Sequence, residues 1–143
     1  MDPASIVSLV ATCGSLAKQC ASVVKALHGL VETLKHAELA LLSMSEECST
    51  IQFAWRKIGN WANENLKHED DCEELVERLQ RSVYCGELVM SALEDEISTV
   101  QSHPGSFKRG VNLVWNKSIF EEHQARLRGQ VAALQLLLQV LSL

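Results

Sequence analysis

Few residues of this chain have the types and spacings that catalysis needs. Glu46-Glu47 and Asp70-Asp71 are adjacent acids. Neighbouring helix positions point in different directions, so neither pair can serve as a general acid and base on one substrate. The chain also lacks the phosphate-binding loop G-x-x-x-x-G-K-[ST], the dinucleotide motif G-x-G-x-x-G, the nucleophile elbow G-x-S-x-G and the zinc-protease motif H-E-x-x-H. We therefore expect a protein that is not an enzyme and needs no cofactor.

A metal site is also not expected. His68 and Cys72 are four residues apart, a spacing that places two ligands on one face of a helix. Two ligands do not make a site, and Cys85 lies too far along the same helix to complete one. We interpret the pair as a surface histidine beside a core cysteine.

The cysteines indicate reduced thiols. There are five, an odd number, and they are scattered through helical pattern. Cys13 and Cys20 are seven residues apart, which is roughly 10 Å along a helix axis and too far for a disulfide. This usage is typical of a cytosolic protein.

Composition limits the partners. The 143 residues are 47% hydrophobic and 22% charged, which is typical of one globular domain. A net charge of −5 argues against nucleic acid, because phosphate binding needs a basic surface. Residues 64–96 hold eleven acids against three bases, whereas the chain from residue 104 onward is basic. The simplest interpretation of the acidic stretch is a solvated face that lies near the basic last helix. The alternative is a surface that docks a basic protein partner through Glu73, Glu74 and Glu77.

The elements that carry these residues are helices. From Ile6 to Ala62, apolar or small residues recur in alternating steps of three and four, the pattern of a heptad seam. One unbroken helix of that length would be roughly 85 Å long, too long for a compact domain of this size. We place a turn at His28-Gly29, with a helix over about 3–27 before it and one over about 31–63 after it. The alternative is one continuous, kinked helix.

Two further helices complete the predicted fold. A second seam of the same spacing runs from Cys72 to Val100, and His103-Pro104-Gly105-Ser106 ends it. Ser118 to Glu121 has the form of a capping box and opens a last helix that is apolar almost all round at its end. Such an end predicts either central burial or continuation into more protein. No strand pattern competes, so the sequence predicts an all-α, antiparallel bundle of about four long helices.

The first of these helices is unusually free of charge. Between Asp2 and Lys18 it has no charged residue, and its polar positions are mostly hydroxyls. Hydroxyl side chains can bond back to their own helix carbonyls, so they are cheap to bury. We expect this helix to be able to lie buried on all sides, in a bundle, in a partner or in a membrane.

The two ends of the chain resemble a known family. A D-P-x-S-[IV] start at Asp2–Ile6, paired with W-N…L-R-G-Q…A-L-x-L-L-L between Trp115 and Leu138, is similar to the HeLo-like domain, the N-terminal domain of fungal STAND (NLR-like) receptors. The resemblance covers nearly the whole chain, residues 1–143. It implies a single helical-bundle domain at the N-terminus of a longer receptor, similar in role to the HeLo domain of heterokaryon-incompatibility proteins and the bundle of mixed-lineage kinase domain-like protein.

The resemblance implies a function in fungal innate immunity. Such domains are cytoplasmic, oligomerise on activation and move to the plasma membrane, where the first helix drives regulated cell death. Carried over to this sequence, the inserting or self-associating positions are Ile6, Val7, Leu9, Val10, Gly14, Leu16, Val23 and Val24. Gly14 would supply close helix approach or a flexible point, or would be simply a tolerated helix glycine.

The length of the uncharged segment qualifies this expectation. It measures roughly 20 Å, shorter than the roughly 30 Å hydrocarbon core of a bilayer. The sequence therefore predicts no constitutive transmembrane span, and insertion would need assembly, membrane thinning or a partial dip. The alternative function is a non-lytic signalling adaptor or oligomerisation module that binds protein partners. A third alternative is a ligand-binding helical bundle, for which the sequence names no convergent polar group.

Overall fold

The protein is a bundle of four long helices. The computed structural model describes residues 3–66, 73–101 and 117–143, and no strand occurs in these three ranges. The helices are α1 (Pro3–Val31), α2 (Glu38–Asn65), α3 (Glu73–Gln101) and α5 (Lys117–Val140), with a short 3-10 helix, η1 (Lys35–Ala37), before α2. The predicted all-α fold is thus confirmed.

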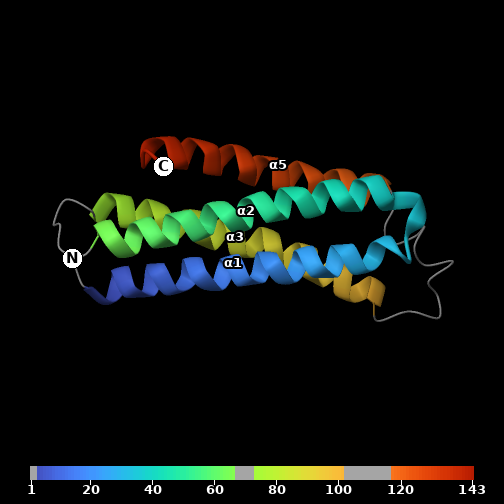
Figure 1. Ribbon diagram of the computed structural model, residues 1–143, viewed down its shortest axis with the longest axis horizontal. Helices are drawn as coiled ribbons and strands as arrows, with labels where there is room; N and C mark the ends of the chain where they lie inside the picture. Colours follow the sequence, from blue (N-terminus) through green and yellow to red (C-terminus); the bar gives the residue numbers. More distant parts are fainter. Residues whose placement is uncertain (1–2, 67–72, 102–116) are drawn as a thin grey trace.

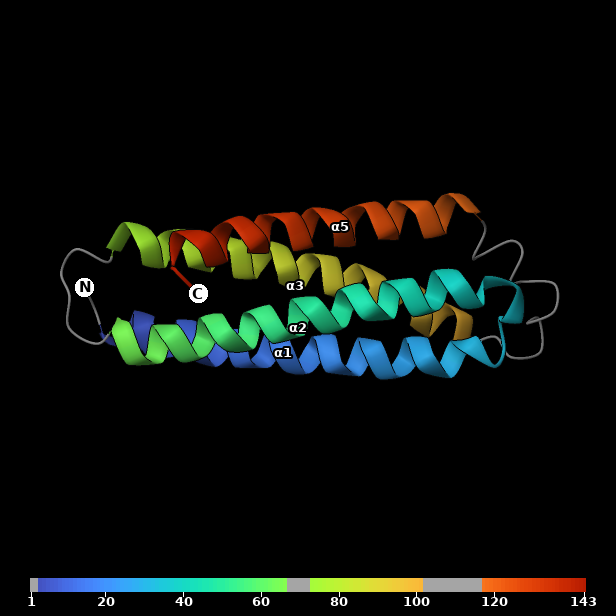
Figure 2. The same ribbon diagram turned by 45° about the horizontal axis from the view of Figure 1, so that its top comes forward.

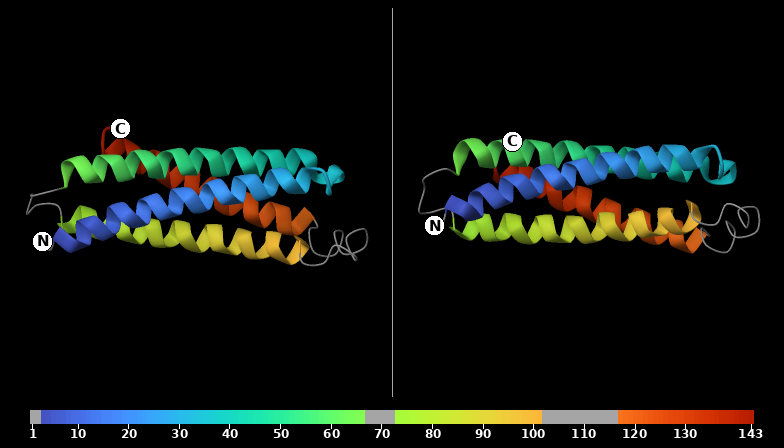
Figure 3. Two further views of the ribbon diagram at one scale, coloured as in Figure 1. Left: turned by 60° about the horizontal axis from the view of Figure 1, so that its bottom comes forward. Right: turned by 90° about the horizontal axis from the view of Figure 1, so that it is seen from below.

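The helices do not pack equally with one another. Consecutive helices alternate in direction along the bundle (Figure 1). Helix α1 shares its largest interface with α2 and a smaller one with α3, whereas α5 packs mainly on α2 and only sparsely on α3. Figure 2 shows α3 beginning beside the end of α5 and running away from it toward α1, and Figure 3 shows α1 lying across α2 and α3. Among the four interfaces α1–α2, α1–α3, α2–α5 and α3–α5, the one between α3 and α5 therefore has the sparsest packing.

The core follows the two predicted seams. Each seam position from Ile6 to Ala62 is buried, and so is each described position of the α3 seam from Val76 to Val100. A heptad spacing keeps one stripe of each helix facing its neighbours, and this explains why both seams end up inside. Trp55, predicted as core, is 1% exposed. Cys72 lies outside the described residues.

The first turn is not where we placed it. Helix α1 continues through Gly29 to Val31, and the chain turns at 32–34, where the amides of Thr33 and Leu34 both donate to the carbonyl of Leu30 at 3.0 and 2.7 Å. A glycine in a helix costs only about 1 kcal/mol, and burial of Leu30 and Leu34 outweighs it. The two helices are separate, as we preferred, but the break lies a few residues later than Gly29.

The apolar end of α5 is not buried centrally. Leu127, Leu134 and Leu141 face the core, while Leu136 is 64% and Val140 is 74% exposed. Since α5 lies at the edge of the bundle, only one stripe of it finds a partner in the described chain.

Candidate functional site: the first helix and its neighbours

Helix α1 divides the residues we singled out between two environments. Ile6, Leu9, Leu16 and Val23 lie in the core, each 8% exposed or less. They pack against the seams of α2 and α3 and so stabilise the bundle in this state. These four positions are therefore available to a membrane or to another copy only if α1 leaves its place.

The remaining positions of α1 are partly or fully accessible. Val7 is 69% exposed, while Val10 and Val24 are half-buried at the edge of the core. Lys18 and Lys25 are exposed. One side of α1 faces solvent, so the expected capacity of this helix to lie buried on all sides is not used in the described state.

Gly14 does not serve close helix packing. It is exposed, and a β carbon built there meets nothing within 4 Å. The close approaches occur at Gly59 of α2, where a β carbon would lie 3.1 Å from Cβ of Cys13, and at Gly86 of α3, where it would lie 2.9 Å from Cδ2 of Leu16. Close helix approach, one of the three interpretations of Gly14, therefore does not apply to this packing.

Two residues on the polar side of α1, Thr12 and Gln19, form side-chain hydrogen bonds. Thr12 donates its hydroxyl to the carbonyl of Ser8 at 2.6 Å, a local bond of the kind expected for hydroxyls in a helix. Gln19 instead reaches α3, where its amide nitrogen donates to Glu94 Oε1 at 2.5 Å and to Ser91 Oγ at 3.2 Å. The hydrogen bond from Gln19 to Glu94 thus links α1 directly to α3.

Helix α1 is long and apolar enough to cross a bilayer by length and composition, over Ser5–Val31. Core helices of soluble proteins meet the same criterion, and 39% of the most apolar window is buried in this bundle. The criterion therefore describes a capacity of the helix and not its state.

The acidic candidates lie at the start of α3. Glu73, Glu74 and Glu77 are all exposed, and none has an ion-pair partner in the described part of the chain. Carboxylates are favourable in a first helical turn, because they oppose the positive end of the helix dipole. Arg78 and Arg81 share a surface hollow with Glu74 and Glu77, so the surface is mixed in charge.

Two polar contacts place α5 against its neighbours. Arg128 Nε lies 3.6 Å from Oε1 of Glu47 in α2, and Nε2 of His123 lies 3.8 Å from Oε1 of Glu96 in α3. Burial raises the pKa of Glu47, against the opposing effect of Arg128. Burial also lowers the pKa of His123, although the nearby Glu96 carboxylate acts in the opposite direction.

Four cysteines fall within the described ranges, and all four are free thiols. Burial raises the pKa of Cys13 to about 11 and those of Cys20 and Cys48 to about 12. Only Cys85 is exposed. No group of three or more His, Cys, Asp or Glu residues able to hold a metal occurs in the described ranges, and the His68–Cys72 pair lies outside them.

One feature of the structure has no counterpart in the sequence pattern. A cavity of about 210 Å³ lies between α3 and α5, with Trp55 of α2 on its floor and Arg78 among its lining residues. Nothing in the spacing of these residues signals a cavity, because it exists only where α3 and α5 stand apart.

The three comparisons made with known proteins found no matching family model, no matching curated protein and no matching solved structure.

Proposed function

We propose that this domain is a membrane-acting effector whose first helix leaves the bundle, self-associates and disrupts the plasma membrane. The proposal includes the role suggested by the family resemblance: the N-terminal, cytoplasmic part of a fungal NLR-like receptor that induces regulated cell death. The carrying observation is the double character of α1, which supplies core residues here yet has the length and apolarity of a span.

The composition of α1 supports this use. Its solvent side has no charged residue between Ser5 and Lys18, and its hydroxyls can bond to their own helix, as Thr12 does to Ser8. Over residues 5–17, apolar contacts and hydroxyls bonded to their own helix can be exchanged for lipid or for other copies of α1 without burying an unpaired charge. No other described helix meets the criterion for a span.

A reversible tether between α1 and α2 tests the release step. A β carbon at Gly59 would lie 3.1 Å from Cβ of Cys13, close to the separation found in disulfides, so Gly59→Cys should form a disulfide with Cys13 after a small shift. We expect the reduced variant to release dye from vesicles of phosphatidylcholine and phosphatidylserine, and the oxidised variant to release none. Reduction of the tethered protein should restore leakage.

Gly59→Ala is the matched control, because it adds the β carbon without the thiol. Its leakage should be the same under oxidising and reducing conditions. Equal leakage by the tethered and untethered forms would overturn the release of α1. Absence of leakage by the reduced protein at every concentration would instead favour the non-lytic alternative.

A second variant separates membrane contact from stability. Val7 is 69% exposed, so Val7→Glu should leave the bundle folded and reduce leakage, because the charge would have to enter the bilayer with α1. Leu88→Glu makes the same kind of change away from α1, at a position of α3 that is 54% exposed. This variant should release dye from vesicles as the wild type does. If Val7→Glu also leaks like the wild type, α1 does not enter the membrane at that end.

The second candidate function is a non-lytic adaptor or oligomerisation module. It is favoured by the exposed, unpaired carboxylates of Glu73, Glu74 and Glu77. In this case a basic protein partner should be lost when all three are changed to Lys. The bundle itself should remain folded, because none of the three is buried.

A further inference from the structure

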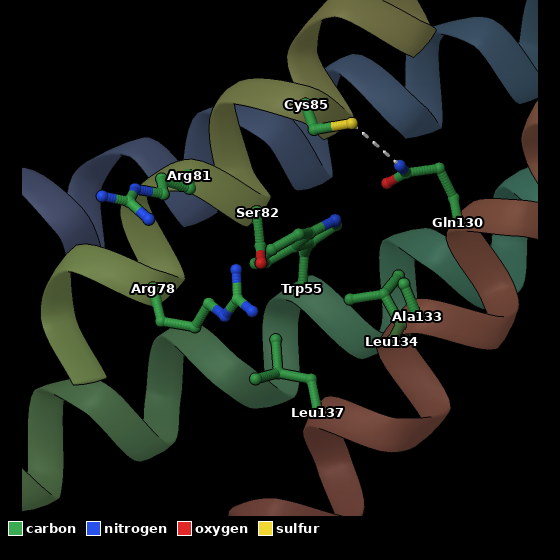
Figure 4. A pocket seen from close by; sticks show the side chains of 9 residues that line it. All are labelled: Trp55, Arg78, Arg81, Ser82, Cys85, Gln130, Ala133, Leu134 and Leu137. Atoms are coloured by element: carbon green, nitrogen blue, oxygen red, sulfur yellow. Dashed lines mark hydrogen bonds between the residues drawn. The ribbon is translucent and has the colours of Figure 1, made fainter. Parts of the chain in front are cut away.

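The cavity between α3 and α5 has the form of a small-molecule site. Trp55 of α2 makes its floor, and Leu134 and Leu137 of α5 make much of its apolar wall (Figure 4). Its volume is about 210 Å³. A cavity of roughly 150 Å³ is enough to hold benzene, so this one can take a single substituted ring or a short branched chain.

The floor of the cavity holds an unpaired donor. Trp55 is 1% exposed, and its indole Nε1–H has no acceptor among the described residues. In Figure 4 this nitrogen points toward Cys85 and Gln130 at the inner end of the cavity. The Nε2 of Gln130 donates to Sγ of Cys85 at 3.4 Å, and the Oε1 of the same amide forms no hydrogen bond with Trp55. A buried donor left in this way is uncommon in folded proteins and is normally satisfied by a partner or a bound molecule.

The outer end of the cavity is positively charged. Arg78 directs its guanidinium toward the Ser82 hydroxyl and the Trp55 ring, whereas Arg81 points away (Figure 4). Neither arginine forms an ion pair with any described residue. A guanidinium beside a hydroxyl is suited to a carboxylate, which accepts charge-assisted hydrogen bonds from both.

We propose that this cavity binds a compact carboxylic acid. Its carboxylate lies at Arg78 and Ser82, and its apolar body lies on the Trp55 ring against Leu134 and Leu137. A second oxygen at the far end accepts the hydrogen bond of the Trp55 indole N–H after a shift of the Gln130 side chain, because this nitrogen is covered in the described structure. The two polar ends and the apolar middle of the cavity each match one part of such a ligand. This inference does not depend on what α1 does.

The indole N–H signal of Trp55 reports binding directly. The protein is labelled with nitrogen-15, and the Trp55 peak is identified by its loss in Trp55→Phe. The probes are 4-hydroxybenzoate, phenylacetate and 4-methylpentanoate, each compared with its uncharged amide. We expect saturable movement of the Trp55 peak with the acids, largest for 4-hydroxybenzoate, and binding at least about tenfold weaker for the amides.

Variants of the wall locate the site. Arg78→Gln should weaken binding of 4-hydroxybenzoate by about tenfold or more, because it removes the charge that faces the cavity. Arg81→Gln is the matched control, with the same change three residues along α3, and should alter binding by less than about threefold because its guanidinium points away. Ala133→Phe, at an exposed position of the wall, should fill the cavity and abolish binding.

Three results would overturn the proposal: no saturable movement of the Trp55 peak with any of the three acids up to their solubility, equal movement with acids and amides, or equal effects of Arg78→Gln and Arg81→Gln. Each is read on the folded bundle, as judged by the unchanged remainder of the spectrum.

Discussion

A β carbon added to Gly86 of α3 would lie 2.9 Å from Cδ2 of Leu16 in α1. The same carbon would lie 3.5 Å from Trp55 Nε1 of α2 and 3.5 Å from Gln130 Oε1 of α5. All four long helices therefore meet around one glycine, and the absence of a side chain at that position permits their close approach.

This meeting point predicts opposite effects for two glycine substitutions. Gly86→Ala should lower the free energy of unfolding by about 1 kcal/mol, because overpacking costs more than alanine gains in helix propensity. Gly14→Ala, where a β carbon meets nothing within 4 Å, should raise it by up to about 1 kcal/mol. Urea unfolding of both variants measures the difference. A stabilising effect of Gly86→Ala would contradict the close packing.

The hydrogen bond from Gln19 to Glu94 predicts a local effect on α1. Gln19→Ala should cost about 1 to 2 kcal/mol and speed hydrogen exchange in α1 more than in α2. Glu94→Gln should cost less, since its side chain can still accept from Gln19. A double-mutant cycle of Gln19→Ala with Glu94→Ala isolates the pair. Additive effects would show that the two side chains do not interact.

Stability should fall as the pH falls below neutrality because of His123. Burial lowers the pKa of this histidine in the folded state, so the unfolded chain binds a proton that the folded chain resists. The contribution of His123 to the free energy of unfolding is fully present above the unfolded pKa of about 6.5. This contribution is lost progressively as the pH falls toward the folded pKa. His123→Leu should flatten this part of the profile. His28→Gln, at an exposed position, is the control and should retain the wild-type slope.

Thiol reactivity should distinguish the cysteines. In a Cys72→Ser background, one thiol should react rapidly with a disulfide reagent at pH 8, and it should be Cys85. The thiolate is the reactive form, and burial raises the pKa values of Cys13, Cys20 and Cys48 to about 11 and about 12. These three should react only after urea unfolding. Cys85→Ser should remove the rapid phase, and fast labelling of a second thiol would contradict the burial.

The heptad period of the sequence correctly predicted which residues form the core. It predicted the core from Ile6 to Ala62 because each seam residue has the same buried stripe to occupy whatever the loops do. It did not locate the first turn. The turn at 32–34 follows from the burial of Leu30 and Leu34 together, and a glycine such as Gly29 is too small a penalty to end a helix.

The division of α1 into a buried and an exposed side could be predicted only in part. The seam indicated that Leu9 and Leu16 would be buried, but the exposure of Val7 depends on where α3 lies. The cavity over Trp55 could not be predicted, because it results from the sparse contact between α3 and α5. Separation between two helices leaves no periodic signal in either of them.

The burial of α1 determines how rarely this helix leaves the bundle. The helix that would act on a membrane also supplies a large part of the core, so releasing it costs a large share of the folding free energy, which is about 5 to 15 kcal/mol for a domain. A cost of about 5 kcal/mol, at about 1.4 kcal/mol per tenfold change, would leave the released form at about one molecule in several thousand. An activating event must then supply several kcal/mol to populate it. If α1 acts as proposed, the bundle itself opposes the release of this helix and so sets an energetic threshold for its activity.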